Sequence, residues 1–364
     1  MQRELFFDIL RFSLGITDRV EASLGDSDWS ELLTVAEQQS LIGVLFSGIE
    51  RMPKEQRPQD RQLLMTWFAA SEMIRQANKE VSQHAVELVR KLSADGFDCC
   101  VLKGQGNALL YPDPAVRTPG DIDLWVTRKG KTAVREVIDY VRRESAEAGM
   151  AVYHHIDYGT FMGTEVEVHY RPSFMHAPWH NRRLQRFFSE QIPVQFAHFR
   201  PMADGTVAVP TVAFNRIYLL LHIGLHLIQS GIGLRQLVDY YYILRQDMTD
   251  AERTETRQTL KHCGLTAIAG AVMYVMQQLF WLDEQHLLVP PDERRGRFLL
   301  NEIMEGGNFG QYDARVSAFA RQTALGHNLE RLRHDCRTLR YFPSESLWEP
   351  VFRLWHFGWR LFHR

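Results

Sequence analysis

The first 95 residues of the chain carry apolar side chains at helical spacing. They recur every three or four positions, first at Trp29, Leu32, Leu33 and Ala36 and later at Leu63, Leu64, Trp67, Phe68, Ile74, Val81 and Leu88. This period is typical of amphipathic helices that bury one face. Gly96, shortly after Lys91, is the residue type expected just beyond a helix C-terminus. The pattern predicts a helical N-terminal region over residues 1–95.

Strand patterning begins directly after this region. Residues 97–102, FDCCVL, form a short apolar run with the length of a buried strand. Gly104 and Gly106 follow and permit a tight turn, and residues 107–110 then have helical character. The sequence therefore predicts a strand, a glycine turn and a helix in that order.

Further strand signals follow up to residue 210. Residues 121–126 alternate between polar and apolar side chains, which predicts a second strand. We expect a helix over residues 129–148, a hairpin of residues 151–158 and 161–170 around Gly159 and Gly163, and a short strand at 207–209. The middle region, 96–210, is therefore expected to be an α+β unit.

Helical spacing returns from Val212 onward. One apolar face contains Phe214, Ile217, Tyr218, Leu221, Leu225 and Ile228, and a second, after Gly231 and Gly233, contains Leu234, Leu237, Val238 and Tyr241. Residues 211–364 are predicted to form a C-terminal helical region. The chain has no internal repeat and no Gly/Ser-rich linker, so we expect both helical regions to pack on the central sheet.

The composition argues against several classes of protein, among them duplex nucleic-acid-binding, disulfide-rich and membrane-spanning proteins. The formal net charge of −2 over 364 residues argues against duplex nucleic acid as the main partner. The four cysteines form no CxxC pair and no dense pattern, so we expect free thiols and a reducing compartment. The N-terminus lacks the features of a signal peptide, and no membrane-spanning segment is expected. These observations predict a cytoplasmic protein.

The strongest chemical signal is the pair Asp121 and Asp123. Residues two apart in a strand share a face, so these aspartates and Trp125 point to one side of the sheet. Neighbouring carboxylates repel each other unless a cation holds them, and Mg²⁺ (or Mn²⁺) bound together with substrate phosphates is a common solution. The alternative is a solvated edge strand with two ordinary aspartates.

A second acidic strand face lies in residues 164–170. Glu165, Glu167 and His169 share it by the same period of two. If the two strands are neighbours, either Glu165 or Glu167 can complete a site of three carboxylates that holds two metal ions. The alternative is simple charge decoration between strands.

The turn Lys103-Gly104-Gln105-Gly106 is the third element. It ends a predicted strand and opens a helix, where free backbone N–H groups attract phosphate and Gly104 allows close approach. It is not a Walker A motif, which requires GxxxxGK[ST]. Taken alone, the turn is also compatible with a tight connection without a ligand.

Together these segments resemble a known family. VLKGQGNALLYPDPAVRTPGDIDLWV, EVEVHYRP and LHLIQSGIGLRQLVDYYYIL are similar to the uncharacterised bacterial nucleotidyltransferase family of the polymerase-beta-like nucleotidyltransferase superfamily. The resemblance runs from about Trp29 to Leu244. It implies a small α+β palm with a mixed sheet, in which a glycine turn holds a triphosphate and three carboxylates hold two Mg²⁺ ions.

The resemblance also assigns residues. Gly104 matches the turn glycine, Asp121 and Asp123 match the paired metal ligands, and Glu167 matches the third carboxylate. The superfamily usually has a Gly-Ser pair at the turn, whereas this chain has Gly104-Gln105 preceded by Lys103. The residues expected to contact nucleotide are Lys103, Gly104, Gln105 and Arg117, and Arg117 could instead hold the loop before Asp121.

The implied activity is transfer of a nucleoside monophosphate from an NTP to an unidentified acceptor, with release of pyrophosphate. The acceptor could be a small molecule, a saccharide or a protein. A different class of function is a non-catalytic nucleotide-binding regulatory or antitoxin-like module with a degenerate palm. A phosphotransferase that moves the terminal phosphate is a third possibility.

Other polar residues carry weaker signals. His222 and His226 lie four apart on one predicted helix, yet zinc needs further ligands, so core or surface histidines are expected. Arg235 and Asp239 also lie four apart, as a helix salt bridge or with a role across the cleft. The aromatic C-terminus is expected to form a helix docked on its own protein rather than a membrane-surface or nucleic-acid-binding helix.

Overall fold

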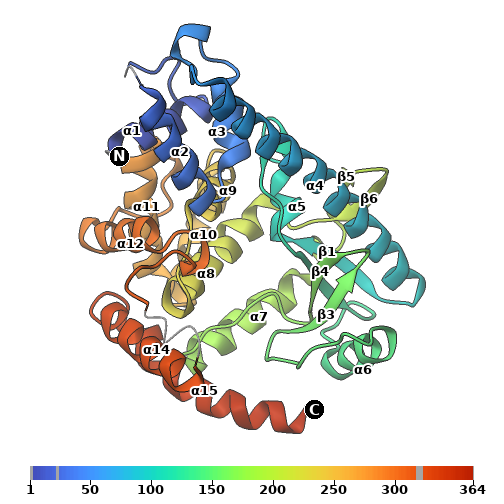
Figure 1. Ribbon diagram of the computed structural model, residues 1–364. Coiled ribbons are helices and arrows are strands. Elements are labelled where there is room, and N and C mark those ends of the chain that lie inside the picture. Colours follow the sequence, from blue (N-terminus) through green and yellow to red (C-terminus); the bar gives the residue numbers. More distant parts are fainter. Residues whose placement is uncertain (1–2, 22–23, 317–322, 364) are drawn as a thin grey trace.

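The computed structural model describes residues 3–21, 24–316 and 323–363, and its centre is one six-stranded mixed sheet (Figure 1). The strands follow the order β3-β4-β2-β1-β6-β5. β1 pairs antiparallel with β2 and parallel with β6, while β2 pairs parallel with β4. The strand bounds are β1 Asp98–Leu102, β2 Ile122–Thr127, β3 His155–Phe161, β4 Thr164–His169, β5 Phe199–Met202 and β6 Gly205–Ala208. The predicted α+β fold with a mixed sheet is confirmed.

Helices from the N-terminal region cover one end and one face of this sheet (Figure 1). They are α1 Arg3–Ser13, α2 Asp26–Gln38, α3 Ile42–Ile49 and the long α4 Arg61–Ala94. The side chain of Asp60 caps α4 by accepting hydrogen bonds from the backbone N–H groups of Gln62 and Leu63. The predicted helical N-terminal region is confirmed.

Successive side chains of β2 point to opposite faces of the sheet and belong to two separate layers of the hydrophobic core. Ile122, Leu124 and Val126 belong to a cluster with α4 and α6 (Val134–Glu144). Trp125 points to the opposite face, where its ring stacks on Phe214 at a centroid distance of 5.8 Å. That face is covered by α7 (Pro178–Gln195) and α8 (Val212–Gln229). Asp123, two residues before Trp125 in β2, therefore points toward the α8 side of the sheet.

The C-terminal half is helical, as predicted. It contains α8, α9 Leu234–Leu244, α10 Asp250–His262, α11 Thr266–Phe280, α12 Glu293–Gly306, α14 Ala324–Leu339 and α15 Pro343–Phe362. Within the described residues, α8 is the one helix long and apolar enough to cross a membrane, and 72% of that stretch is buried inside the protein. Such burial is typical of a central core helix.

Some predicted boundaries differ from the observed ones. The helix expected over 129–148 is shorter, and the hairpin begins at His155 and turns at Met162-Gly163, with Gly159 at a register shift inside β3. Helix α7 and strand β5 have no counterpart among the predicted elements. The spacing of Leu184, Phe188 and Ile192, all buried, is the signal that identifies α7.

Helix α15 docks on the protein through one side only. The ring of Tyr153 meets those of Phe352, Trp355 and Trp359 at centroid distances of 6.0, 5.5 and 6.2 Å. Trp348 also packs inward, against Trp179, whereas other large apolar side chains of this helix are exposed: Leu347, Val351, Leu354, Phe357, Leu361 and Phe362. The expected docked helix is therefore present, but an apolar stripe of it faces outward.

Candidate active site

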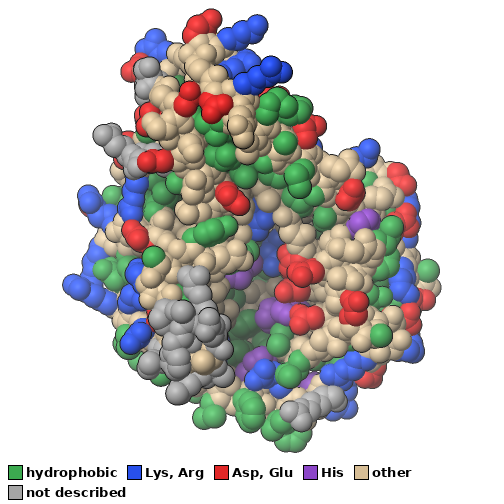
Figure 2. All heavy atoms as spheres, in the orientation of Figure 1, with side chains coloured by type: hydrophobic (Ala, Val, Ile, Leu, Met, Phe, Trp, Pro, Cys, Tyr) green, Lys and Arg blue, Asp and Glu red, His purple; other side chains and the backbone are tan. Residues whose placement is uncertain are grey.

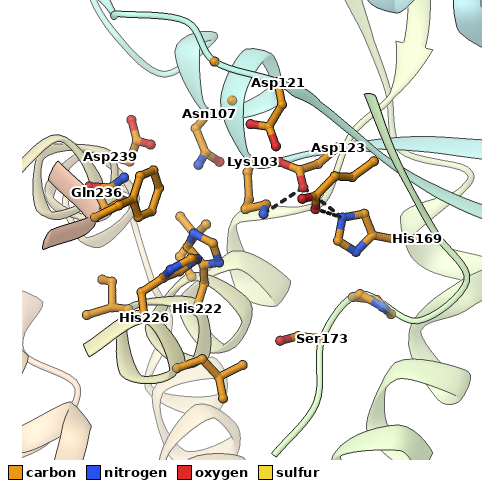
Figure 3. Close-up of a pocket in the computed structure, with 18 of the residues that line it drawn as sticks. Lys103, Asn107, Asp121, Asp123, His169, Ser173, His222, His226, Gln236 and Asp239 are labelled. Carbon is orange, nitrogen blue, oxygen red and sulfur yellow. Dashed lines mark hydrogen bonds and ion pairs between the residues drawn. The ribbon is translucent and has the colours of Figure 1, made fainter. Parts of the chain in front are cut away.

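A cavity of about 360 Å³ opens between the sheet and helices α8 and α9. Figure 2 shows this hollow, with acidic and histidine side chains gathered on one rim. One wall is formed by the turn after β1 and by residues of β2 and β4. The opposite wall is formed by α8, with His222 and His226, and by α9, with Gln236 and Asp239 (Figure 3). Phe309 also lines the cavity.

The three predicted carboxylates meet in this cavity. Asp123 on β2 and Glu167 on β4 are direct partners in the register of the two parallel strands, and Asp121 immediately precedes β2. All three line the cavity. Glu165 is exposed and lies opposite Thr160 of β3, outside the cavity lining. Of the two glutamates that the sequence left open, Glu167 is the one placed beside the aspartates.

The turn after β1 brings a lysine to the aspartates. Lys103 and Gly104, which open α5 (Lys103–Ala108), both have positive φ angles, 42° and 26°. A left-handed conformation is costly for a lysine and is typical of positions that the surrounding structure constrains. The turn places Lys103 Nζ 2.8 Å from Asp123 Oδ1. The side chain is therefore directed into the cavity by its backbone.

His169 links two of the acids. Its Nε2 lies 2.8 Å from Asp123 Oδ1 and 3.1 Å from Glu167 Oε2. Burial opposes its charge, but the hydrogen bonds to both carboxylates outweigh burial and raise the pKa of His169 to about 9. The two carboxylates thus favour the charged form of His169, and its Nε2 lies within hydrogen-bonding distance of both.

The three acids differ in their electrostatic environment. Burial would raise the pKa of Asp123 and Glu167, but Lys103 and His169 lower both. The repulsion from Asp123, together with burial, instead raises the pKa of Asp121 to about 6. Asp121 is thus the acid of this cluster whose charge the neighbouring cations compensate least.

The donor set fits a hard divalent cation. Carboxylate oxygens are the ligands that Mg²⁺ prefers. Ligand atoms of Asp123, Glu167 and His169 lie within 4.8 Å of one another. Both Lys103 and His169 contact Oδ1 of Asp123, and no hydrogen bond from the described residues reaches Oδ2. The second oxygen of Asp123 is therefore open to a cation.

Two of the residues expected to contact nucleotide have other partners. Arg117 lines the cavity, but its guanidinium is paired with the carboxylate of Asp239. Gln105 lies outside the cavity lining, and its side-chain amide donates to Asn78 and Ser82 of α4. Lys103 and Gly104 line the cavity as expected. The side chain of Gln105 therefore points away from the cavity that Lys103, Gly104 and Arg117 line.

The opposite wall contains residues that the sequence did not assign to a site. His222 and His226, expected in the core or on the surface, both line the cavity, and their rings are 4.2 Å apart. Burial, followed by the charge of Lys103, lowers the pKa of His226 to about 4, so this ring is neutral. Among the described residues, the groups of three potential metal ligands include neither histidine.

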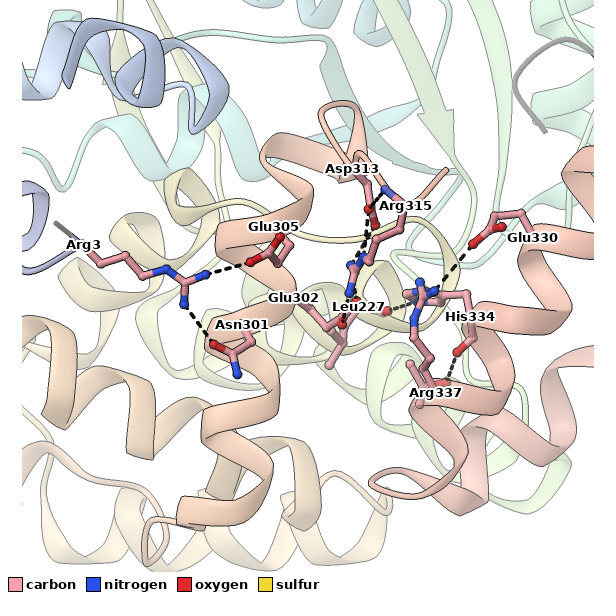
Figure 4. A network of polar contacts seen from close by, with 11 residues as sticks. Arg3, Leu227, Asn301, Glu302, Glu305, Asp313, Arg315, Glu330, His334 and Arg337 are labelled. Atoms are coloured by element: carbon pink, nitrogen blue, oxygen red, sulfur yellow. Dashed lines mark hydrogen bonds and ion pairs between the residues drawn. The ribbon is translucent and has the colours of Figure 1, made fainter. Parts of the chain in front are cut away.

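Phe309 completes this wall from a distant part of the sequence. It has a φ of 52°, and its ring lies 4.7 Å from that of His226. The segment that follows it is tied to α12 by Arg315, which hydrogen-bonds to Asp313 and Glu302 at 2.8–2.9 Å (Figure 4). No pattern in the sequence linked Phe309 to the acidic strands, because the contact exists only in the folded chain.

A family model described as "Uncharacterised nucleotidyltransferase" matches residues 25–281. The chain belongs to this nucleotidyltransferase family. The matched region contains the whole sheet and every residue that lines the cavity except Phe309. No curated protein and no solved structure matches the chain.

Proposed function

We propose that the protein transfers a nucleoside monophosphate from an NTP to an acceptor and releases pyrophosphate. The observation that supports this most directly is the meeting of Asp121, Asp123 and Glu167 beside the Lys103-Gly104 turn in one cavity. Nucleotidyl transfer needs a charged phosphate chain held next to metal-binding carboxylates. Membership in a nucleotidyltransferase family agrees with this chemistry.

The carboxylates of Asp121, Asp123 and Glu167 would hold Mg²⁺ or Mn²⁺. Such ions neutralise charge on the phosphates and stabilise the attacking and leaving oxygens. His169 fixes the orientation of Asp123 and Glu167 through its two hydrogen bonds. The protein thus supplies oriented oxygen donors before substrate binds, which reduces reorganisation during the reaction.

Strand order supports a proposed side of the cavity for each of the two substrates. Lys103 follows β1, Asp123 lies on β2 in the middle, and Glu167 lies on β4. We assign the triphosphate to the β1 side, where Lys103 and the backbone of Gly104 can bind it. The acceptor hydroxyl then approaches from the β4 side, near Glu167. Its oxygen forms a bond to the α-phosphorus, the bond from that phosphorus to the bridging oxygen breaks so that pyrophosphate leaves, and the hydroxyl proton passes to water.

A direct test is incubation of the purified protein with each NTP, Mg²⁺ and a metabolite extract. Mass spectrometry should detect a nucleotidylated product, and a coupled assay should detect pyrophosphate. The double variant Asp121→Asn, Asp123→Asn should form neither. Glu165→Gln, an exposed change on the same strand as Glu167, should leave both products unchanged. Equal product formation by the double variant would refute the assignment of these aspartates.

One observation favours the non-catalytic alternative. The turn has Gln105 where the superfamily usually has serine, and its side chain is turned toward α4. The turn therefore offers no side-chain hydroxyl to a triphosphate. A degenerate palm would show NTP-dependent thermal stabilisation without pyrophosphate release from any acceptor. A phosphotransferase would instead release a nucleoside diphosphate.

A further inference from the structure

Most charged groups in the cavity wall are neutralised within the protein. Four ion pairs account for them: Lys103 with Asp123, His169 with Asp123, His169 with Glu167, and Arg117 with Asp239. Two charged groups that line the cavity remain, the carboxylate of Asp121 and the guanidinium of Arg235. A metal ion would compensate the negative charge of Asp121, and a bound anion would compensate the positive charge of Arg235.

Arg235 is a buried cation on α9 that faces the cavity. Its exposed fraction is 9%, and its Nη1 donates to the carbonyl oxygens of Thr118 and Pro119 at 3.1 and 3.3 Å. Within the described ranges, no carboxylate forms an ion pair with it, and its buried Nε has no hydrogen-bond partner. Asp239, four residues later on the same helix, is occupied by Arg117.

A buried guanidinium without a counter-ion is unfavourable. Arginine does not deprotonate in proteins, so burial must be compensated by hydrogen bonds or by an opposite charge. Carbonyl oxygens offset this cost only partly. Burial, and then the charge of Arg117, lower the pKa of Arg235 to about 10, and they outweigh the opposing effect of the Asp239 and Asp121 carboxylates.

The position of Arg235 relates it to the acidic cluster. A Cβ atom at Gly120 would lie 3.8 Å from Nη1 and 3.9 Å from Nη2 of Arg235. Gly120 directly precedes Asp121, so an anion on the guanidinium lies beside a proposed metal ligand. Neighbours on the same wall are Gln236 and the neutral His226, which can donate or accept hydrogen bonds without adding charge (Figure 3).

We propose that Arg235 binds a phosphate group of a substrate in this cavity. A guanidinium matches the geometry of phosphate oxygens and can form two parallel hydrogen bonds with them. The choice of phosphate as the anion rests on the proposed nucleotidyl transfer. The group belongs either to the triphosphate of the NTP or to a phosphorylated acceptor, which two separate measurements distinguish.

Arg216 provides a matched control. Its exposed fraction is 1%, and its Nη2 donates to the carbonyl oxygens of Gln246 and Asp247. Like Arg235, it has no carboxylate partner among the described residues, but it does not line the cavity. A purely structural role for Arg235 would make Arg235→Gln and Arg216→Gln equivalent in every binding assay.

The test is isothermal titration calorimetry, which needs no turnover. One arm titrates the non-hydrolysable ATP analogue AMPCPP with Mg²⁺, and the other titrates orthophosphate into protein saturated with AMPCPP and Mg²⁺. Arg235→Gln should weaken one of the two affinities at least tenfold, and Arg216→Gln should change both less than twofold. Loss in the first arm assigns the NTP phosphates, and loss in the second assigns the acceptor phosphate.

Arg235→Lys keeps the charge and is the variant to use if Arg235→Gln does not fold. In the titration that Arg235→Gln weakens, the affinity of Arg235→Lys should be at least threefold lower than that of the wild type, because an ammonium group cannot form the paired hydrogen bonds. Wild-type affinity in both arms for either variant would overturn the proposal. Because calorimetry measures binding alone, a protein that binds but shows no pyrophosphate release would contradict the proposed function and leave this site standing.

Discussion

The guanidinium of Arg117 and the carboxylate of Asp239 are joined by two parallel hydrogen bonds of 2.8 Å. This pair connects the loop before β2 to helix α9, and the hydroxyl of Tyr111 donates a further hydrogen bond of 2.7 Å to Asp239. Both charged side chains are buried. The loop that presents Asp121 is therefore fixed to the opposite wall of the cavity.

Asp239→Asn should destabilise the protein strongly, because it leaves the Arg117 cation buried without a counter-ion. Breaking a buried pair in this way typically costs about 3–5 kcal/mol. Urea unfolding should show a correspondingly lower midpoint. Glu136→Gln removes the exposed partner of Arg128 and should cost at most about 1 kcal/mol. Equal midpoints for the two variants would show that the buried pair is not structurally important.

Gly104→Ala tests the turn after β1. A Cβ atom at this position would meet only the carbonyl oxygen of Asp121, at 3.6 Å, so there is space for it. The φ of 26° is nevertheless unfavourable for alanine, and we expect a loss of about 1–2 kcal/mol in stability. Nucleotide affinity should fall as well, because relief of the strain moves the backbone N–H groups.

Gly358→Ala is the control for this change. Gly358 lies in helix α15 without a positive φ, and no atom lies within 4 Å of the position that an added Cβ would take. Alanine there should stabilise the protein by roughly 0.5–1 kcal/mol through helix propensity. Thermal unfolding of both variants should give shifts of opposite sign. A stabilising effect of Gly104→Ala would show that the turn does not need its left-handed conformation.

Glu345 should make the protein sensitive to acid. It lies in the first turn of α15, is largely buried, and accepts a hydrogen bond of 2.7 Å from the backbone N–H of His176. Burial opposes its charge, but hydrogen bonds from His176 and His180 lower the pKa of Glu345 to about 2. A lowered pKa contributes stability that is complete above the unfolded value, 4.5, and is lost as the pH falls toward 2.

The linked contribution amounts to roughly 3 kcal/mol, most of which is lost between pH 6 and pH 2.5. Urea unfolding between pH 6 and pH 2.5 should therefore show a smaller decline in stability for Glu345→Gln than for the wild type. Glu190→Gln, a change of an exposed residue on α7, should decline like the wild type. Parallel curves for the wild type and Glu345→Gln would contradict the role assigned to this carboxylate.

Local patterns predicted the centre of the fold and the acidic residues that lie together in the candidate site. The period of two along residues 121–126 placed Asp121 and Asp123 on the face opposite Ile122 and Leu124, as the core layers confirm. The same period in residues 164–170 placed Glu167 with His169, and strand pairing then brought Glu167 next to Asp123. Such patterns are readable because they depend on neighbours in the sequence.

The other half of the site depends on contacts between distant segments. Arg117 and Asp239 are 122 positions apart, and nothing in the spacing of either residue predicts their pairing. Gln105 adjoins the glycine turn in sequence, yet one turn of helix directs its side chain to α4. Phe309 joins the cavity through a loop beyond the family's matched region. Tertiary packing, rather than local propensity, decides these positions.

Asp121→Asn should separate stability from activity. The repulsion from Asp123, together with burial, raises the pKa of Asp121 to about 6, so its ionised form is disfavoured in the folded protein. A raised carboxyl pKa destabilises the fold as the pH rises from the unfolded value of 3.8 through 6. At pH 7 in the presence of EDTA, the asparagine variant should therefore be more stable than the wild type, by up to about 3 kcal/mol.

This advantage should disappear below pH 4, where Asp121 of the wild type is protonated. Pyrophosphate release should fall at least a hundredfold in the same variant, since loss of a proposed metal ligand removes about 3 kcal/mol of transition-state stabilisation. Glu165→Gln should change neither quantity. Urea unfolding at pH 7 and pH 4, combined with the pyrophosphate assay, checks both effects. A variant less stable than the wild type at pH 7 would mean that Asp121 is compensated in the folded protein, and the argument for a cation beside it would fail.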